Sequence, residues 1–592
     1  MRFILFFLGL SFINLTNAQT NTYSISFENA VHHEAHIQAS FPNITADTLI
    51  VQMSRTSPGR YALHEFAKNV YGFNAKDSNG SVLAVTRPDP YSWAISGHDG
   101  TINLEYTLFA NRGDGTYSQI DETHAHLNIP ATFMFAPSLS ERKITVDFKV
   151  RKDLDWNIAT QLPKVDGTTY MAPNLHYFMD SPTEISNFKI REFLLDGQTV
   201  RLALHDPGSQ QEADAYFEKV KKVVLAEKEV FGELPNFDYG TYTFLACYVP
   251  NASGDGMEHR NSTILTSTRT LANGGMDQNI GTVSHEFFHS WNVERIRPES
   301  LEPFDFEEAN MSGELWFAEG FTSYYTNLIL CRAGLITPEE YVEGLNGTFN
   351  YVWNSPARRF FNPIEMSFQA PFVDAATSVD PVNRENTFIS YYSYGSALGL
   401  ALDLALREKG LTLDDYMKQV WLEHGKTELP YTIENLNAAL NTYAGETFGN
   451  SFFDSYIYKS DMPNYEGLLK NVGITISQNS KIPFFGAKIS IAEDLKGEIT
   501  TNTLIGSPAY KSGLEKGDII LSINGTPFAA EVTFENFLEK HFTPNDTVTV
   551  RFERFGEERS TDLVLGTETT YKLGMVEKSG QQPSKKTLKA RK

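Results

Sequence analysis

His285-Glu286-Phe287-Phe288-His289 is the most informative segment of this 592-residue chain. Residues i and i+4 of an α-helix lie one above the other, so a helix here turns both imidazoles toward one point. Neutral imidazole nitrogens at about 2.0–2.1 Å suit zinc. Glu286 is rotated by about 100° from His285, so it can accept a proton at the edge of the site without being a ligand. Chance would produce this pattern only about 0.02 times in such a chain, so it predicts a metal site.

A third metal ligand is offered further along the chain. A catalytic zinc usually has three protein ligands and one open position. Glu314-Leu-Trp-Phe-Ala-Glu-Gly-Phe-Thr-Ser-Tyr-Tyr325 places Glu319 inside an apolar, aromatic helix. An unpaired carboxylate is expensive to bury there, and a cation would remove that cost. The alternative is an ion pair with Arg295 or Arg297, but beside the first motif we expect Glu319 to ligate zinc.

The two motifs together resemble the gluzincin metallopeptidases, whose His ligands and Glu ligand lie on two successive helices. Residues 315–321 are similar to the aminopeptidase segment that ends in Glu-Gly-Phe, with Glu319 at the ligand position. Residues 290–318 form a longer insert than large zinc aminopeptidases have. His289-Ser-Trp-Asn-Val-Glu-Arg-Ile-Arg-Pro298 resembles instead the glycyl aminopeptidase family. That resemblance implies a β domain, a gluzincin domain, a PDZ domain and release of small first residues, Gly or Ala.

A glycine-rich segment between two predicted strands fits the same family. Gly254-Asp-Gly-Met-Glu-His259 resembles the Gly-x-Met-Glu-Asn strand of zinc aminopeptidases. The resemblance implies that Glu258 pairs with the free α-ammonium of the substrate, which makes an exopeptidase. Gly256 would let the substrate backbone approach closely, and His259 would donate a hydrogen bond near the site. The alternative is a polar turn with an exposed Glu.

Ser390-Tyr-Tyr-Ser-Tyr-Gly395 opens a predicted helix. Related aminopeptidases carry Tyr-x-Lys-Gly here, and the Tyr hydroxyl stabilises the tetrahedral oxyanion. Tyr392 matches that position, but Tyr394 stands where the family has Lys. Tyr391 and Tyr394 remain alternatives, and a cluster of aromatic residues at a helix start is also typical of a core.

The segment from Gly506 to Gly525 resembles a PDZ domain of the bacterial protease type. Such a domain receives the C-terminus of a peptide by strand addition, so a C-terminal peptide is an expected ligand. Phe484-Phe-Gly-Ala487 is a loose match to its carboxylate loop. The alternative is a module that docks on its own catalytic domain.

The distribution of strand-like and helix-like patterns along the chain predicts a multidomain protein. Residues 23–27, 101–106 and 143–150 alternate apolar and polar side chains, which is typical of strands, whereas long helical patterns dominate after residue 277. The expected parts are a signal peptide (1–18), an N-terminal all-β, sandwich-like domain (19–185), an α-rich α+β catalytic domain of the gluzincin, thermolysin-like type (186–468), a PDZ domain (469–570) and a basic disordered tail (571–592).

Composition narrows the function further. The formal net charge is −23, which argues against nucleic-acid binding. Arg2 followed by an apolar run and Thr16-Asn-Ala18 predicts cleavage before Gln19. No later segment is long and apolar enough to span a membrane, so we expect an exported periplasmic or extracellular protein that acts on peptides or proteins.

The two cysteines, Cys247 and Cys331, can form at most one disulfide bridge with each other.

Overall fold

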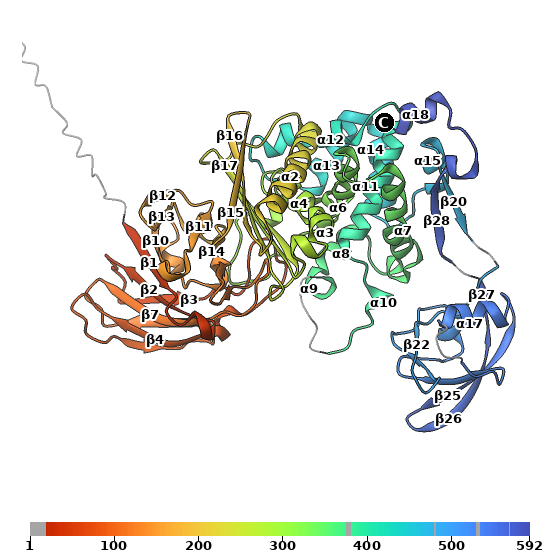
Figure 1. Ribbon diagram of the computed structural model, residues 1–592, viewed down its shortest axis with the longest axis horizontal. Helices are drawn as coiled ribbons and strands as arrows, with labels where there is room; N and C mark the ends of the chain where they lie inside the picture. The colour runs from red at the N-terminus through yellow and green to blue at the C-terminus, as the bar shows by residue number, and fades with distance from the viewer. Residues whose placement is uncertain (1–18, 375–379, 479–480, 529–532, 568, 592) are drawn as a thin grey trace, which may run out of the picture. The chain divides into compact units, whose positions relative to one another are not determined.

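The computed structural model describes residues 19–374, 380–478, 481–528, 533–567 and 569–591 (Figure 1). The predicted signal peptide, residues 1–18, lies outside these residues. The chain divides into two compact units, and each is described by itself. The first unit comprises the chain up to Ser57, Glu65–Phe188 and Asn251–Ser253, and the second comprises Pro58–His64, Lys189–Pro250 and Gly254–Lys592.

The first unit is built of strands, as the alternating pattern predicts. The predicted strands are present as β1 (Thr20–Ser26), β7 (Ile102–Phe109) and β10 (Lys143–Lys149), and in each of them every second side chain is buried. They belong to a seven-stranded sheet in the order β12-β13-β10-β1-β2-β7-β4, which accompanies a four-stranded and a three-stranded sheet. The remaining strands are β2 (Glu34–Phe41), β3 (Thr48–Gln52), β4 (Val70–Lys76), β5 (Ala84–Thr86), β6 (Ser92–Ser96), β8 (Gln119–Ile120), β9 (His124–Leu127), β11 (Asn157–Thr160), β12 (Lys164–Asp166), β13 (Thr169–Ala172) and β14 (Thr183–Ser186), with one helix, α1 (Leu175–Met179).

The second unit begins with a five-stranded sheet in the order β15-β16-β17-β19-β18. Its strands are β15 (Lys189–Leu195), β16 (Gln198–His205), β17 (Thr241–Tyr248), β18 (Asp255–His259) and β19 (Ser262–Ser267). The edge strand β18 runs antiparallel to β19, and it carries the glycine-rich segment identified in the sequence. That segment is therefore part of the sheet, and its Glu258 side chain is buried rather than exposed in a turn.

Helices form the rest of the catalytic part, which confirms the expected α-rich α+β class. They are α2 (Gln210–Phe231), α3 (Gly275–Gln278), α4 (Ile280–Phe288), α5 (Leu315–Ala318), α6 (Gly320–Arg332), α7 (Pro338–Asn354), α8 (Pro363–Phe368), α9 (Ala370–Val373), α10 (Arg384–Thr387), α11 (Tyr391–Glu408), α12 (Leu413–Val420), α13 (Ile433–Ala444), α14 (Glu446–Phe452) and α15 (Tyr465–Asn471). The apolar, aromatic helix that the sequence predicts around Glu319 is broken in two at that residue.

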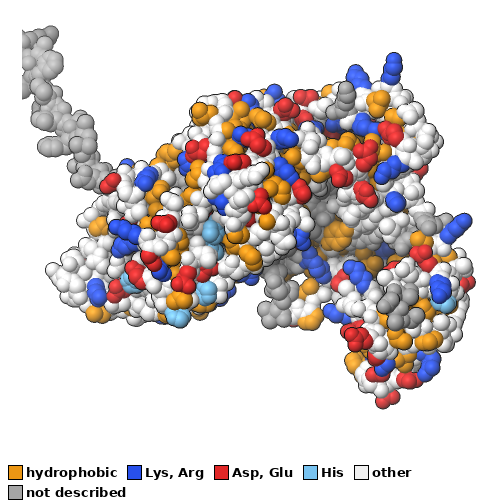
Figure 2. Space-filling model, in the orientation of Figure 1, with side chains coloured by type: hydrophobic (Ala, Val, Ile, Leu, Met, Phe, Trp, Pro, Cys, Tyr) orange, Lys and Arg blue, Asp and Glu red, His pale blue; other side chains and the backbone are white. Residues whose placement is uncertain are grey.

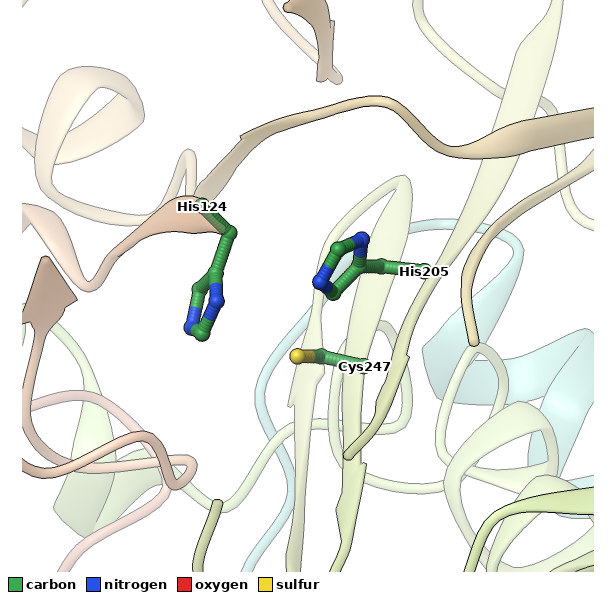
Figure 3. A group of neighbouring side chains, drawn as sticks. All are labelled: His124, His205 and Cys247. Atoms are coloured by element: carbon green, nitrogen blue, oxygen red, sulfur yellow. The ribbon is translucent and has the colours of Figure 1, made fainter. Parts of the chain in front are cut away.

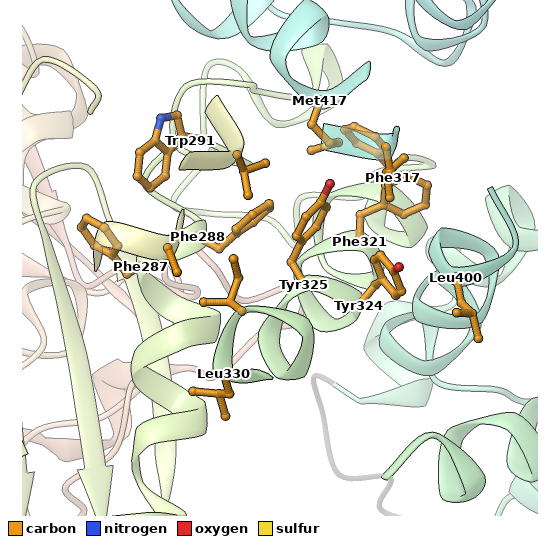
Figure 4. Packing of buried hydrophobic residues seen from close by; sticks show 14 of the residues in the cluster. Phe287, Phe288, Trp291, Phe317, Phe321, Tyr324, Tyr325, Leu330, Leu400 and Met417 are labelled. Carbon is orange, nitrogen blue, oxygen red and sulfur yellow. The ribbon is translucent and has the colours of Figure 1, made fainter. Parts of the chain in front are cut away.

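Aromatic side chains hold α4 against α6 (Figure 4). Phe288 of α4 stacks on Tyr325 of α6 with ring centroids 4.6 Å apart, and Phe287 meets Trp291 edge to face at 5.3 Å. All four side chains are fully buried. Because large buried rings in close contact resist displacement, this packing fixes the helix that carries both histidines.

A backbone contact brings α11 against the junction of α5 and α6. A Cβ added at Gly395 would lie 1.8 Å from the carbonyl oxygen of Trp316, and one added at Gly320 would lie 2.4 Å from the Cα of Gly395. Only glycine allows so close an approach. The contact therefore seats the tyrosines at the start of α11 near Glu319.

Both cysteines are free thiols, Cys247 buried and Cys331 partly buried. Cys247 of β17 is the register partner of His205 on the neighbouring parallel strand β16, and Figure 3 shows their side chains together. Of the two arrangements that the sequence leaves open, the structure has the unbridged one.

The C-terminal module is a five-stranded sheet with its own hydrophobic core. Its elements are β22 (Ile489–Ile491), β23 (Gly497–Ile499), β24 (Ile519–Ile523), β25 (Thr547–Arg554), β26 (Glu557–Val564), the short strands β21 (Pro483–Phe484) and β27 (Gly566–Thr567), and the helices α16 (Pro508–Lys511) and α17 (Phe534–His541). This β-rich module with its own core matches the predicted PDZ-type domain in class.

The prediction that the chain is disordered from residue 571 onward is wrong. Residues 571–575 form β28 (Tyr571–Met575), which pairs with β20 (Ile474–Gln478) outside the five-stranded sheet. Leu573 and Met575 are buried in the core of the catalytic part. The basic residues beyond form α18 (Lys585–Arg591), where Arg591 pairs with Glu577 at 2.6 Å. Buried apolar side chains and this ion pair order a segment whose composition alone indicates disorder.

The visible surface carries charges of both signs. Figure 2 shows Lys and Arg side chains scattered among Asp and Glu on the visible face. Among the described residues, no helix combines the length and the apolar character needed to cross a membrane.

Candidate metal centre and active site

Helix α4 brings the two predicted imidazoles together. Nε2 of His285 lies 3.1 Å from Nε2 of His289, and their ring centroids are 4.7 Å apart. His289 follows the last helical residue and is buried, whereas the His285 side chain is 19% exposed. The i,i+4 spacing therefore brings the two imidazoles together, as the sequence predicts. The His289 imidazole faces the interior, and the His285 imidazole reaches the solvent side.

Hydrogen bonds on the far side of each ring set its tautomer. Nδ1 of His289 lies 2.6 Å from the carbonyl oxygen of Asn292, which can only accept, so this nitrogen carries the proton. Nδ1 of His285 lies 3.2 Å from the hydroxyl of Thr326, which donates its own proton to the Thr322 carbonyl. Both Nε2 atoms are thereby left as bare electron-pair donors, as metal ligation requires.

Glu319 lies at the break between α5 and α6, and its carboxylate faces the two histidines. Oε2 is 3.2 Å from Nε2 of His289 and 3.5 Å from Nε2 of His285. Despite burial, which raises the pKa of a carboxyl group, the two histidines hold the pKa of Glu319 well below its usual range. Among the described residues neither alternative arginine pairs with it: Arg295 donates to backbone carbonyls and Asn261, and Arg297 pairs with Glu302.

The three facing atoms have the geometry of a zinc site. Three ligands at about 2.0–2.1 Å from a tetrahedral zinc lie about 3.3–3.4 Å from one another, and the three separations here run from 3.1 to 3.5 Å. Oε2 of Glu319 is buried and has no hydrogen-bond partner within the described chain. A divalent cation between the two imidazoles would satisfy it. The donor set, two neutral nitrogens and one carboxylate oxygen, fits zinc.

Two further carboxylates border the same point. Single ligand-type atoms of Glu258, Glu286 and His289 lie within 4.8 Å of one another. Burial raises the pKa of Glu286 and of Glu258, and each has another carboxylate nearby that raises it further. A Cβ at Gly256 would lie 2.1 Å from Oε1 of Glu286, so this position has room only for glycine. The predicted base, amine anchor and glycine are therefore neighbours.

The tyrosines at the start of α11 lie beside the proposed ligands. The Tyr392 ring lies 5.9 Å from that of His285, and both line a cavity of about 300 Å³. Tyr391 is buried against Tyr392, with centroids 4.8 Å apart. Tyr394 is also buried, and its hydroxyl lies by Ser460 instead. Among the described residues, Tyr392 is therefore the alternative that combines contact with His285 and a place on this cavity, while Tyr391 lies behind it, against Tyr61.

His259 does not join this group. It is fully buried at the end of β18, as the register partner of Ser262. Successive side chains of a strand point to opposite faces, so His259 leaves the strand on the face opposite to Glu258. The predicted hydrogen bond from His259 near the site receives no support from this position.

Sequence reasoning missed the residues that hold the ligands in place. Nδ1 of His289 donates to the backbone carbonyl of Asn292, and because every residue carries such a carbonyl, the sequence holds no signal for this contact. Thr326 lies one helical turn beyond Thr322 on the helix that follows Glu319. Tyr61 donates to Glu319 from 258 positions away, and no local pattern indicates such a contact.

Fold and site together define a zinc metallopeptidase of the aminopeptidase type. Family models match the chain in three places: the Peptidase M61 N-terminal domain over residues 22–187, the M61 glycyl aminopeptidase over 278–398 and the PDZ domain over 473–565. The chain therefore belongs to the glycyl aminopeptidase family of PDZ-containing zinc metallopeptidases, which confirms the resemblance seen in the sequence.

One solved structure agrees with this assignment over nearly the whole chain. An aminopeptidase N family protein from Idiomarina loihiensis is 25% identical, with a TM-score of 0.83 over 96% of this chain and 99% of that chain. An M1 zinc metallopeptidase mutant from Deinococcus radiodurans, bound to a Tyr-Ser-Ala substrate, is 11% identical over 75% of this chain and 95% of that chain. Its TM-score of 0.43 is too low to support any conclusion about this chain. Among curated proteins no match is found.

Proposed function

We propose that this enzyme releases small first residues, Gly or Ala, from peptides, with one zinc ion per chain held by His285, His289 and Glu319. The observation that carries the proposal is the triangle of two bare imidazole nitrogens and one buried carboxylate oxygen, with separations of 3.1–3.5 Å. A zinc ion held there would polarise the scissile carbonyl and make water a stronger acid.

Glu286 is the proposed general base and acid. Its Oε2 is buried and has no hydrogen-bond partner within the described chain, and it borders His289 without belonging to the ligand triangle. In this role it takes a proton from the attacking water and delivers it to the leaving amine. Proton transfer by one positioned side chain contributes about 10²–10⁴-fold to the rate.

Tyr392 is the proposed hydrogen-bond donor to the oxyanion. It lines the same cavity as His285, and its ring lies 5.9 Å from the ring of that proposed ligand. A donor aimed at developing charge in a water-poor site is typically worth about 10²–10³-fold in kcat.

Glu258 is the proposed anchor for the α-ammonium of the substrate. It is buried close to Glu286 and His289, and an unpaired carboxylate in that position is costly unless a cation approaches it. Glycine is required on both sides: Gly256 lies against Glu286, and a Cβ at Gly59 would come within 3.0 Å of Oε2 of Glu258. Such close packing around the anchor favours a small first residue, as the family resemblance implies.

Replacing Glu258 by Ala should reduce kcat/KM for peptides with a free N-terminus by at least about 10²-fold, because a buried charge pair is lost. Cleavage of N-acetylated peptides, which lack the ammonium group, should change little. The measurement is kcat/KM for matched free and acetylated peptides with the same sequence. Equal losses on both substrates would reject the anchor role.

The overall proposal is tested with a panel of aminoacyl reporter substrates. We expect glycyl and alanyl reporters to be hydrolysed fastest, with activity lost in chelator and restored by added zinc. Fast cleavage of acetylated peptides would favour the second candidate, a zinc endopeptidase whose substrates are selected by the PDZ domain, for which the PDZ match at 473–565 is the supporting observation. Chelator-insensitive turnover would contradict both.

We also propose that the PDZ domain receives a peptide C-terminus and that residues 1–18 direct export to the periplasm or the medium. The support for export is the apolar run after Arg2 and the small residues before Gln19.

A further inference from the structure

The segment Pro58–His64 lies in the second unit, although the residues on either side of it in the sequence belong to the first. Its Tyr61 is 3% exposed and packs in a small cluster with Leu315, Ala318 and Tyr391, next to the break that carries Glu319. From there its hydroxyl donates a hydrogen bond to Oε1 of Glu319 at 2.7 Å. A distant part of the chain thus contacts a proposed ligand.

The two oxygens of Glu319 are divided between different partners. Oε1 accepts from Tyr61, whereas Oε2 faces the imidazoles of His285 and His289. A carboxylate free to rotate would offer either oxygen, or both, to a cation. With Oε1 engaged, only Oε2 points at the site.

We propose that Tyr61 is a positioning residue that makes Glu319 a one-oxygen zinc ligand and holds its side chain in the ligating orientation. This inference rests on the proposed role of Glu319. Partners behind a metal ligand orient it and raise affinity, and their loss typically weakens metal binding about 10–100-fold.

The segment is held so that Tyr61 cannot swing away. Gly59 has φ +78°, and a Cβ there would lie 2.1 Å from Sδ of Met257, so the backbone lies directly on β18. Arg60 forms an ion pair with Asp255 of the same strand. The Tyr61 ring meets Tyr391 edge to face with centroids 6.1 Å apart. A donor fixed on both sides in this way is pre-organised for its acceptor.

The test is the zinc affinity of Tyr61→Phe, measured by competition with a chromogenic chelator on the full chain. Tyr324→Phe is the matched control, because Tyr324 is also buried and donates to a buried carboxylate, Asp403, at 2.7 Å. We expect Tyr61→Phe to weaken zinc binding about 10–100-fold and Tyr324→Phe to leave it within about twofold. An unchanged or tighter affinity in Tyr61→Phe would overturn the inference, and so would equal weakening in both variants.

A third variant, Glu319→Ala, distinguishes a failure of the role of Tyr61 from a failure of Glu319 as a zinc ligand. If Glu319→Ala loses zinc and Tyr61→Phe does not, Glu319 is a ligand and only the role of Tyr61 is wrong. If Glu319→Ala keeps zinc, the proposed site itself fails. The activity of Tyr61→Phe should return when zinc is supplied far above its weakened Kd, which a mere defect in folding would not produce.

Discussion

Replacement of Glu286 by Gln is expected to lower kcat by about 10³-fold or more while zinc stays bound. The amide has nearly the same shape as the carboxylate but cannot accept a proton from water, and positioned proton transfer contributes about 10²–10⁴-fold. Glu286 borders His289 but is not a member of the His285, His289 and Glu319 group, so the metal content should not change. The measurements are turnover of a glycyl reporter and zinc per chain by elemental analysis.

The matched control for Glu286→Gln is Glu339→Gln, which makes the same exchange at an exposed position in the first turn of α7. This variant should keep full activity and full zinc. Normal turnover by Glu286→Gln would contradict the assigned chemistry. Loss of zinc together with activity would instead show that Glu286 supports the metal rather than the proton transfer.

The second large effect is expected from Glu319→Ala, which removes one of three proposed ligands. Its loss should weaken zinc binding by more than the 10–100-fold typical of residues behind a ligand, so the purified variant should contain little zinc. Zinc should also cease to stabilise the fold, because a ligand stabilises only in proportion to its binding of the native state. Zinc content and the shift in Tm on adding zinc report these two effects.

Glu314→Ala is the control for the loss of a buried carboxylate in the same segment. Glu314 precedes α5, where its Oε2 accepts hydrogen bonds from Ser300 and Ser312 rather than facing the histidines. This variant should lose stability but retain zinc. If Glu319→Ala contains as much zinc as Glu314→Ala, Glu319 is not a ligand.

Much of the fold could be predicted because its signals are local. In β1, β7 and β10 every second side chain is buried, as the alternation of apolar and polar residues in the sequence predicts. The C-terminal tail was mispredicted because composition reports average polarity. In the structure β28 pairs with β20, and its Leu573 and Met575 are buried in the catalytic core.

Some features of the candidate site could likewise be predicted from local sequence signals, and others could not. The i,i+4 imidazoles follow from helical geometry, so His285 and His289 could be paired from the sequence. The predicted single helix hid the break at Glu319, whose geometry depends on the backbone contact between Gly395 and Trp316. The family resemblance of the segment Gly254–His259 places His259 beside Glu258, whereas alternation along β18 turns the two side chains to opposite faces of the sheet.

By itself the sequence determined the helix that pairs two imidazoles, the carboxylates available to them and the order of the domains, since each of these depends on spacing within a short stretch. Only the tertiary structure decided which oxygen of Glu319 faces the imidazoles and that a tyrosine 258 positions away holds the other. The physical reason is that such contacts exist only after packing has brought distant segments within a few ångströms, and no local pattern encodes that approach.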